Sequence, residues 1–271
     1  QHNGETVIVT GDGVNDAPAI QTSDIGVAMG ITGTDVAKEA ADVVLQDDNY
    51  TTIVKAIRQG RGIFGNFIKF LKYQISCNLS GVLIVLPLSV VTGTTPLAPV
   101  HILLLNLISE TGPSIALGLE KPDKNIMDIP PRKKYERLLT RSRWLRIVCE
   151  AVLLAGAGIA AYVIAVRINP LTATSAVLAT AFLSRLWHAL SSRSETLSIF
   201  SGKLQRNPSL YYTIAGTVAC LLVSLYTPIG NSIIKTVPLS ASLMGICLLV
   251  SILPLVVMEI YKMIIRHRAS A

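Results

Sequence analysis

Two carboxylates and a side-chain amide lie close together in a glycine-containing turn near the start of the chain. Residues 10–18 have the sequence TGDGVNDAP and follow an apolar run at 7–9. Glycine lets the backbone approach a ligand closely, and Asp12 and Asp16 offer the hard oxygen ligands that Mg²⁺ prefers. Asn15 adds a neutral polar group between them. The pattern therefore predicts a magnesium and phosphate site.

A second polar set lies inside an apolar stretch. Asn106, Ser109 and Glu110 are spaced i, i+3 and i+4, so on a helix they share one face. Gly112 and Pro113 follow, and such a pair can interrupt a helix and free backbone carbonyls for a cation. A charge inside a bilayer is costly and usually marks an ion path or a paired structural site. This spacing predicts a cation site.

The elements that position the first set alternate along the chain. The pattern predicts strands at 7–10 and 25–29 and helices at 18–23 and 34–44. Thr34 and Asp35 are expected to cap the second helix. Alternating strands and helices favour a parallel sheet, and ligands of such sheets bind at the carboxyl ends of strands, where Asp12 is expected.

A long helical pattern runs from residue 50 to about residue 91 and passes through Gly60 and Gly62. About forty helical residues would span roughly 60 Å, twice the thickness of the hydrocarbon core of a bilayer. We interpret this segment as a cytoplasmic stalk that continues into a membrane span, able to carry a shift at the phosphate site into the membrane. The alternative is two helices that are broken at the glycines.

The composition is that of a membrane protein. Hydrophobic residues make up 51% of the chain, charged residues make up 15%, and the mean hydropathy is +0.52. These values are too apolar for an ordinary soluble domain. The fold class is therefore mainly an α membrane bundle of six transmembrane helices, preceded by part of an α/β domain. After the first span, the pattern predicts five more at 99–119, 144–166, 171–191, 210–229 and 239–264.

Most of the basic residues behind the net charge of +7 lie between the apolar spans. The connections at 121–146 and 193–206 and the end of the chain are rich in Lys and Arg, whereas the alternate connections carry little charge. The positive-inside rule explains this distribution, so both termini are expected in the cytoplasm. The same rule removes the reason to expect nucleic acid as a partner. It does not choose between the plasma membrane and an organelle.

The four cysteines lie within apolar segments and show no CxxC spacing. We therefore expect packed free thiols instead of disulfides or metal ligands. They are Cys77, Cys149, Cys220 and Cys247.

The stretch at 10–20 resembles the TGDGVNDAPAL hinge motif of P-type ATPases, with Ile in the last position. The string is long and specific, and the segment at 34–42 is also similar to the family's sequence after the hinge. The resemblance implies a phosphorylation domain of haloacid-dehalogenase type. In it, Asp12 is a magnesium ligand, Asn15 contacts phosphate, and Asp16 is a second carboxylate that supports the metal. The alternative, an EF-hand calcium loop, lacks its glycine at the sixth position and its acid at the twelfth.

The span at 99–119 resembles the sixth membrane helix of the calcium-pump branch of this family, whose pattern is NLVTDGLPATALG. On that resemblance Asn106, Ser109 and Glu110 are ligands of the transported cation. Glutamate replaces the usual aspartate, which keeps the charge and lengthens the side chain. The preferred ion is therefore left open.

Residues 75–81, ISCNLSG, resemble the calcium-pump sequence ISSNVGE, which makes Asn78 another ligand. Gly81 stands where the two-ion calcium pump has a glutamate, and Arg185 falls where that pump has another. We therefore expect one calcium per cycle, with Arg185 as a built-in counter-charge that fills the empty first site and pairs with Glu110 or with other carboxylates. The alternative for Arg185 is a structural charge that extends toward the membrane interface.

The resemblance implies the C-terminal portion of an ATP-driven cation pump. Residues 1–50 would belong to the phosphorylation domain, 51–66 to the stalk, and 67–271 to the last six membrane helices. The expected reaction of the complete pump is calcium export from the cytosol through an aspartyl-phosphate, with Mg²⁺ as cofactor and ATP as substrate.

The DKTGT motif, which carries the phosphorylated Asp in this family, does not occur in the sequence. We therefore expect that this chain alone does not hydrolyse ATP. Its expected partners are the transported cation, the lipid bilayer and the missing N-terminal part of the pump. The alternatives are a manganese, sodium or proton pump, and a non-catalytic membrane fragment or partner.

Overall fold

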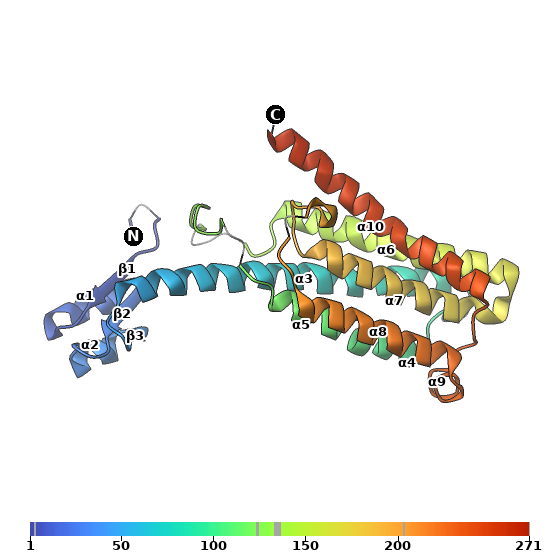
Figure 1. The fold of residues 1–271 in the computed structure, drawn as a ribbon, viewed down its shortest axis with the longest axis horizontal. Helices are drawn as coiled ribbons and strands as arrows, with labels where there is room; N and C mark the ends of the chain where they lie inside the picture. Colours follow the sequence, from blue (N-terminus) through green and yellow to red (C-terminus); the bar gives the residue numbers. More distant parts are fainter. Residues whose placement is uncertain (3, 123–124, 133–136, 203, 271) are drawn as a thin grey trace. The chain divides into compact units, whose positions relative to one another are not determined.

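The structure is a computed structural model that describes residues 1–2, 4–122, 125–132, 137–202 and 204–270 (Figure 1). The chain divides into two compact units. The first contains Gln1–Phe64 and Pro122–Leu138, and the second contains Gly65–Lys121 and Leu139–Ala271.

The first unit contains a three-stranded parallel sheet in the order β1-β2-β3. Apolar side chains pack on both faces of the central strand: Ile20, Ala28 and Ala37 form one cluster, and Val27, Met29 and Leu45 form the other. The predicted parallel sheet and its central strand at 25–29 are confirmed. The elements are β1 (Ile8–Gly11), η1 (Val14–Asp16), α1 (Ala17–Thr22), β2 (Ile25–Met29), α2 (Asp35–Ala40) and β3 (Val43–Leu45).

The predicted helix at 34–44 is wrong in its second half. Thr34 caps α2 by accepting a hydrogen bond from the Ala37 amide, but the helix ends at Ala40 and β3 follows. Asp42 exchanges hydrogen bonds with Gly26: its amide donates to the Gly26 carbonyl at 2.9 Å, and its carboxylate accepts from the Gly26 amide at 2.9 Å. The sheet therefore supplies hydrogen-bond partners for this segment, which competes with a continuation of the helix. The β-branched Val43 and Val44 also favour a strand.

The long helix α3 (Tyr50–Thr92) is continuous through Gly60 and Gly62. Its 43 residues correspond to about 65 Å at 1.5 Å per residue. The alternative of two helices broken at the glycines is therefore excluded. The boundary between the two units falls inside α3, after Phe64.

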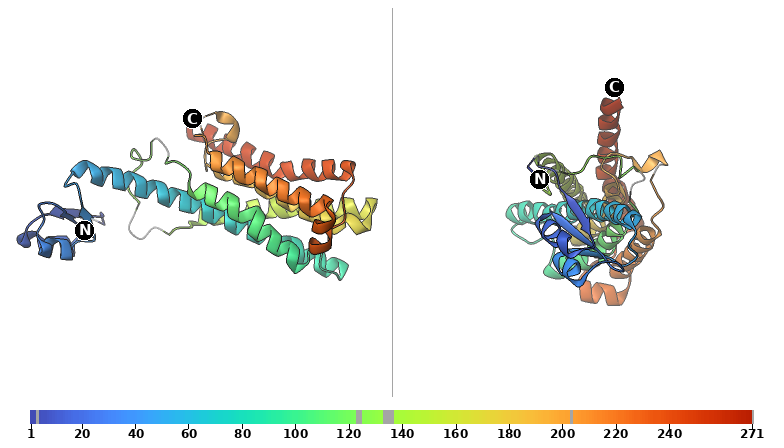
Figure 2. Two further views of the ribbon diagram at one scale, coloured as in Figure 1. Left: turned by 60° about the horizontal axis from the view of Figure 1, so that its bottom comes forward. Right: turned by 90° about the vertical axis from the view of Figure 1, so that its left-hand side faces the viewer.

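The second unit is a helical bundle (Figure 2). Helix α7 packs against α6, α8, α10 and the α5 region, and every residue from Ser175 to Leu186 is buried. Its core includes Phe182 of α7 together with Ile84, Leu105 and Leu221 from three other helices. The remaining helices of this unit are α4 (Pro99–Leu104), η2 (Leu105–Glu110), α5 (Thr111–Gly118), α6 (Arg141–Ile168), η3 (Pro170–Thr172), α7 (Ala173–Ser192), η4 (Ile199–Ser201), α8 (Pro208–Tyr226), α9 (Pro228–Ile234) and α10 (Ala241–Ser270).

Five helical segments in the described residues are long and apolar enough to cross a membrane. They are α3, the continuous run α4-η2-α5, α6, α8 and α10. Helix α7, at the position of the fourth predicted span, has 20 residues but is not among these five. Its burial by neighbouring helices gives the reason: a helix shielded from lipid can carry polar residues such as Arg185 and His188. All four cysteines are free, as predicted, although Cys149 is exposed and not packed.

Candidate functional site

The turn after β1 is held in shape by Asp16. One carboxylate oxygen of Asp16 accepts hydrogen bonds from the backbone amides of Asp12 at 3.2 Å and Gly13 at 3.0 Å. Gly11 is required here, because an added Cβ would lie 2.5 Å from the Cβ of Asp16. Pro18 lies in the first turn of α1, where its missing N–H removes no helical hydrogen bond. The turn therefore fixes Asp12 at the carboxyl end of β1.

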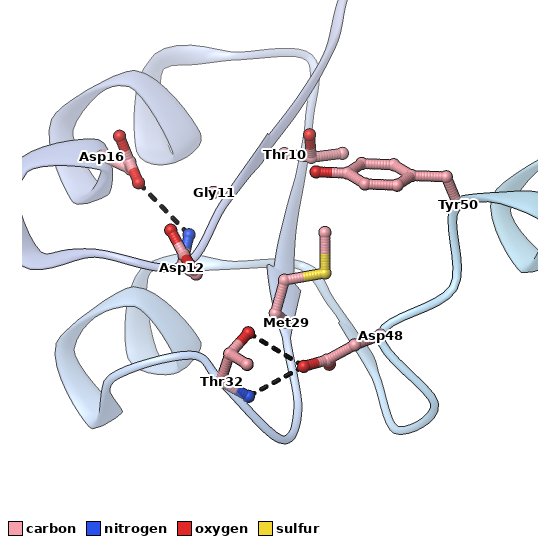
Figure 3. A pocket seen from close by; sticks show the side chains of 8 residues that line it. All are labelled: Thr10, Gly11, Asp12, Asp16, Met29, Thr32, Asp48 and Tyr50. Atoms are coloured by element: carbon pink, nitrogen blue, oxygen red, sulfur yellow. Dashed lines mark hydrogen bonds between the residues drawn. The ribbon is translucent and has the colours of Figure 1, made fainter.

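A pocket of about 360 Å³ opens beside this turn (Figure 3). It lies where β1 and β2 end, as expected for a parallel sheet. The ring of Tyr50 extends toward Thr10 at one edge of the pocket. Asn15 is exposed and does not line the pocket, so the structure does not bring it to Asp12. The lining residues are Thr10, Gly11, Asp12, Asp16, Met29, Thr32, Asp48 and Tyr50.

Asp48 is the residue of this pocket that the sequence analysis missed. Its carboxylate accepts hydrogen bonds from the backbone amides of Gly30 at 2.6 Å, Ile31 at 3.0 Å and Thr32 at 2.8 Å, and from the Thr32 hydroxyl at 2.9 Å. These donors, the Ile31 amide first, lower the pKa of Asp48 to about 2. A turn after β2 and an acid after β3 must meet at one edge of a parallel sheet, so recognising β3 would have revealed this contact.

The pocket fits a magnesium ion only with help from a ligand. Among the described residues no group of three or more His, Cys, Asp or Glu side chains is placed to hold a metal. Asp48 uses both carboxylate oxygens on the turn after β2, and Asp16 uses one on its own turn. Asp12 is exposed at the pocket. One or two carboxylates plus phosphate oxygens and water are the usual magnesium environment, which this donor set matches.

The second candidate site surrounds η2, a π-helical segment that contains Asn106, Ser109 and Glu110. The helix does not unwind at Gly112 and Pro113, which lie within the regular helix α5; the irregular segment comes just before it. Pro113 has no N–H, so it cannot donate to the Ser109 carbonyl, four residues earlier. The π-helical segment accommodates this missing hydrogen bond without unwinding the helix.

Side chains from neighbouring helices bind carbonyls in this segment. The hydroxyl of Tyr73 donates to the Ser109 carbonyl at 3.3 Å, and the hydroxyl of Thr217 donates to the Ile108 carbonyl at 3.3 Å. In a membrane these donors replace those that regular α-helical geometry would supply. The segment is therefore fixed by contacts from α3 and α8.

Glu110 is fully buried and carries an ion pair. Its Oε1 lies 2.7 Å from Nη1 of Arg185, and its Oε2 accepts hydrogen bonds from the side-chain amides of Gln74 at 2.7 Å and Asn78 at 3.3 Å. The Arg185 guanidinium also donates to the Cys77 carbonyl at 3.2 Å. The structure thus brings three predicted site residues together: Asn78, Glu110 and Arg185.

The space at Gly81 adjoins this pair. A Cβ added at Gly81 would lie 3.5 Å from Nη2 of Arg185, which is ordinary van der Waals contact. A glutamate side chain at this position would therefore begin beside the guanidinium. The position that lacks a carboxylate, Gly81, and the guanidinium of Arg185 are therefore adjacent in the structure.

The other two predicted ligands are less engaged. Ser109 is buried, and its hydroxyl has no hydrogen-bond partner among the described residues. Asn106 is half-buried, and across the described chain no hydrogen bond connects its side chain to Glu110. Within the described part of the chain, other helices hold the Ser109 and Ile108 carbonyls and the Glu110 carboxylate.

Gln74 was missed by the sequence analysis. Its amide nitrogen donates to Glu110, and its amide oxygen accepts from the Ser114 hydroxyl at 2.8 Å, so it links α3 to both η2 and α5. Gln74 precedes Asn78 by four residues and therefore lies on the same face of α3. That spacing was the available signal.

Two further buried glutamates, Glu150 and Glu259, connect helices. Glu150 pairs with Arg146 at 2.9 Å and lies 3.4 Å from the Ser76 hydroxyl of α3. Glu259 pairs with Lys262 at 2.7 Å and accepts a hydrogen bond from Ser191 of α7 at 2.6 Å.

Comparisons with known proteins agree with this arrangement. A family profile described as "Cation transporting ATPase, C-terminus" matches residues 94–264, and one described as "haloacid dehalogenase-like hydrolase" matches residues 1–57. The chain is 40% identical over 243 residues to a "Calcium-transporting ATPase" of Bacillus subtilis (strain 168), covering 89% of this chain and 27% of that protein.

Other relatives carry similar names. The chain is 40% identical over 282 residues to "Calcium-transporting ATPase 1" of Bacillus cereus, covering 96% of this chain and 31% of that protein. It is 36% identical over 242 residues to "Calcium-transporting ATPase type 2C member 1" of Homo sapiens, covering 89% of this chain and 26% of that protein. The chain therefore spans between a quarter and a third of the length of these curated relatives.

Proposed function

Since this chain belongs to the P-type cation-transporting ATPases, of which it is similar to the C-terminal part, we propose that the complete protein is an ATP-driven pump that exports calcium from the cytosol. The observation that carries this proposal is Glu110, a fully buried carboxylate between membrane helices that is bound by Gln74, Asn78 and Arg185. Ionisable groups buried between membrane helices generally mark a transport path.

The pocket at Asp12 would serve the phosphoryl-transfer half of the cycle. Asp12 would hold Mg²⁺ at the carboxyl end of β1, and Asp16 would orient Asp12 through its bonds to the turn. When bound, Mg²⁺ supplies positive charge that stabilises a transferring phosphoryl group. We assign Asn15 a contact with phosphate in the complete enzyme, in which a substrate-bearing domain would meet this exposed residue. An aspartyl-phosphate formed elsewhere in the protein would be the intermediate.

The Glu110 site would bind the transported cation. The Asn78 side chain and the carbonyls of η2 supply neutral oxygens, Ser109 supplies a hydroxyl, and Glu110 supplies the charge that a divalent cation needs. Asn106 joins this set if the segment rotates by a fraction of a turn. A π-helical segment is suited to such a rotation because it interrupts the regular hydrogen-bond pattern.

Arg185 would act as a tethered counter-charge. In the structure its guanidinium is paired with Oε1 of Glu110, so a cation that binds this oxygen must displace the guanidinium. Once the cation leaves, the guanidinium returns, and Glu110 need not bind another ion to stay neutralised. Because Gly81 offers no side chain and Arg185 fills the space beside it, we expect one calcium per cycle.

The test is calcium transport by the complete pump in proteoliposomes. We expect ATP-driven uptake with a Hill coefficient near one, and loss of calcium-dependent phosphorylation in Glu110→Gln, because an amide cannot supply the missing charge. Glu39→Gln, an exposed acid on α2, is the matched control and should transport normally. Cooperative calcium uptake, or wild-type calcium affinity in Glu110→Gln, would contradict the assignment.

A second candidate is a pump for manganese, sodium or protons. The Glu110–Arg185 pair favours this possibility, because a divalent cation must replace a guanidinium that already neutralises the carboxylate. Uptake of each ion by the same proteoliposomes separates the candidates. Uptake of one of these ions without calcium uptake would replace calcium in the proposal and leave the pump function intact.

We also propose that both termini of this multi-pass protein face the cytosol and that α7 crosses the membrane within the bundle. An even number of crossings between the start of α3 and the end of α10 requires α7 to be one of them. This places the Asp12 pocket on the side where ATP is present. The basic connections at 121–146 and 193–206 support the same orientation.

A further inference from the structure

The two oxygens of the Glu110 carboxylate have different partners. Oε2 accepts hydrogen bonds from Nε2 of Gln74 at 2.7 Å and from Nδ2 of Asn78 at 3.3 Å. Oε1 has no hydrogen-bond partner among the described residues and is ion-paired with Nη1 of Arg185, 2.7 Å away. A cation that displaces the guanidinium therefore frees Oε1, while Oε2 keeps its two amide donors.

Gln74 is the main partner of Oε2. The side-chain nitrogen of Asn78 also donates to the backbone carbonyl of Gln74 at 2.9 Å, so its contact with Glu110 is the longer of its two hydrogen bonds. Within the described part of the chain, Nε2 of Gln74 donates to Glu110 alone. Removing the Gln74 amide therefore releases Oε2 from its shortest hydrogen bond.

The amide oxygen of Gln74 is anchored on the neighbouring helix α5. It accepts a hydrogen bond from the hydroxyl of Ser114 at 2.8 Å, and Ser114 is buried. An ionised carboxylate accepts hydrogen bonds and donates none, so the amide nitrogen of Gln74 must face Glu110 and the amide oxygen must face Ser114. Any rotation of the amide breaks the hydrogen bond of this buried hydroxyl, which is costly. Ser114 therefore fixes the orientation in which Gln74 holds Oε2.

The number of carboxylate oxygens that a cation receives affects which cation is bound. Ca²⁺ takes about six to eight oxygen ligands and accepts both oxygens of one carboxylate. A smaller divalent cation such as Mn²⁺ suits an octahedral set of about six oxygens, to which each ligand contributes one. A carboxylate that is held to one free oxygen therefore removes an advantage of the larger ion without affecting the smaller one.

We propose that Gln74, oriented by Ser114, is a specificity-determining residue of the pump. It retains Oε2 of Glu110, so that the transported cation receives Oε1 alone, and it thereby limits the preference of the site for Ca²⁺ over smaller divalent cations. This inference rests on the proposed pump function. Gln74 acts through Glu110 and is a positioning residue. If Gln74 only fastened α3 to α5, its loss would weaken the binding of every cation alike.

The test compares two cations in the complete pump. The concentrations of Ca²⁺ and of Mn²⁺ that half-saturate phosphorylation are measured in the wild type and in Gln74→Met, which keeps a similar side-chain length and removes the amide. Ca²⁺ can then bind both oxygens of Glu110, so the ratio of the Mn²⁺ value to the Ca²⁺ value should rise about fivefold, equivalent to about 1 kcal/mol. The ratio cancels effects common to both cations, so a general loss of stability leaves it unchanged.

Ser114→Ala tests the same role from the other end of the amide. It leaves Gln74 in place and removes the hydroxyl that orients it, so the ratio should rise in the same direction and by less. Ser114→Thr keeps a hydroxyl and should keep the wild-type ratio. Ser224→Ala is the matched control, because Ser224 is also buried and its hydroxyl donates to the Cys220 carbonyl of its own helix at 2.8 Å. Its ratio should equal that of the wild type.

Infrared spectroscopy gives a direct measurement that decides the question even if neither Gln74→Met nor Ser114→Ala folds. In protein labelled with ¹³C-glutamate, the carboxylate stretching bands of Glu110 are those that shift with the label in the wild type and not in Glu110→Asp. The separation between the two stretching bands is wider for a carboxylate bound through one oxygen than for one bound through both. With Ca²⁺ bound, we expect the wide separation in the wild type, and a narrow one would overturn the proposal.

The outcomes separate this inference from the pump function. A ratio that is unchanged in both Gln74→Met and Ser114→Ala, or that shifts in favour of Mn²⁺, overturns the role of Gln74 and leaves the pump function intact. A shift shared by Ser224→Ala would show a general change of the bundle and would overturn that role too. If the wild-type protein shows no ATP-driven uptake of a divalent cation, the proposed function fails, and this inference fails with it.

Discussion

Removing the guanidinium of Arg185 should tighten cation binding and lower the stability of the cation-free protein. In Arg185→Gln, Glu110 remains fully buried with only the amides of Gln74 and Asn78 as partners. A cation can then bind the Glu110 carboxylate without competing with an internal positive charge. The same variant leaves an unpaired buried charge whenever the cation is absent, and that state is unfavourable.

The magnitude follows from the ion pair. Two unit charges 2.7 Å apart attract by roughly 6 kcal/mol at an effective dielectric constant of about 20. If a third of this, about 2 kcal/mol, is lost when a cation displaces the guanidinium, its removal strengthens cation binding about 30-fold. Loss of one partner of a buried pair typically destabilises a protein by about 3 to 5 kcal/mol, so the cation-free variant should melt earlier.

The assay combines two measurements on the complete pump. Calcium titration of phosphorylation gives the affinity, and thermal unfolding with and without calcium gives the stability. Calcium should raise the melting temperature of Arg185→Gln more than that of the wild type, because it restores the missing positive charge. The double variant Glu110→Gln/Arg185→Gln has no buried charge at this site and should recover much of the lost stability without binding calcium.

The refuting result is specific. If Arg185→Gln binds calcium no more tightly than the wild type, the guanidinium does not compete with the cation. If the double variant is no more stable than Arg185→Gln alone, the pair is not coupled in the folded protein. Either result would return Arg185 to the role of a structural charge.

Three further predictions concern the rest of the chain. Asp12→Ala should reduce phosphorylation of the complete pump by about a hundredfold or more through loss of a magnesium ligand, while Glu39→Ala leaves it unchanged; equal activities would contradict the site. The turn after β2 should keep its hydrogen-exchange protection, corrected for the intrinsic rate, well below the usual pKa of an aspartate, because the pKa of Asp48 is lowered to about 2. A carboxyl group whose pKa is lower in the folded than in the unfolded protein stabilises the fold above the unfolded pKa, and this stabilisation is lost as the pH falls through the folded pKa. Protection of the wild-type turn should therefore disappear only near the folded pKa. In Asp48→Ala the protection should be absent at every pH. Finally, a cysteine introduced at Ser232 should react with an impermeant maleimide only from the non-cytosolic side of the membrane, and one at Thr196 only from the cytosolic side. The reverse pattern would invert the proposed orientation.

The choice of control in the first of these follows from the structure. Asp42 would be silent if it lay on the surface of a helix, as the sequence pattern predicts. Instead its carboxylate binds the Gly26 amide at the start of the β2–β3 pairing. Replacing Asp42 would disturb the sheet that positions Asp12, so exposed Glu39 is the proper comparison.

Local sequence determined the features that depend on near neighbours. The strand at 25–29, the Thr34 cap and the long helix from residue 50 follow from apolar periodicity and capping chemistry within a few residues. The hinge motif identified Asp12 and Asp16, because their spacing is contained in one turn. The apolar spans and their basic connections were also visible, since bilayer thickness and loop charge are properties of segments.

Tertiary structure decided the features that depend on partners distant in the sequence. The three-residue strand β3 exists because β2 supplies its hydrogen bonds, and Asp48 joins the pocket only once β3 brings it to the turn after β2. The π-helical segment at Glu110 is set by donors from α3 and α8, while the sequence showed only the proline that requires them. Whether Arg185 meets Glu110 or extends to the membrane surface likewise depends on how α7 packs in the bundle. A buried charge has no local signature of its partner, because the desolvation that makes the pairing necessary arises only when the helices assemble.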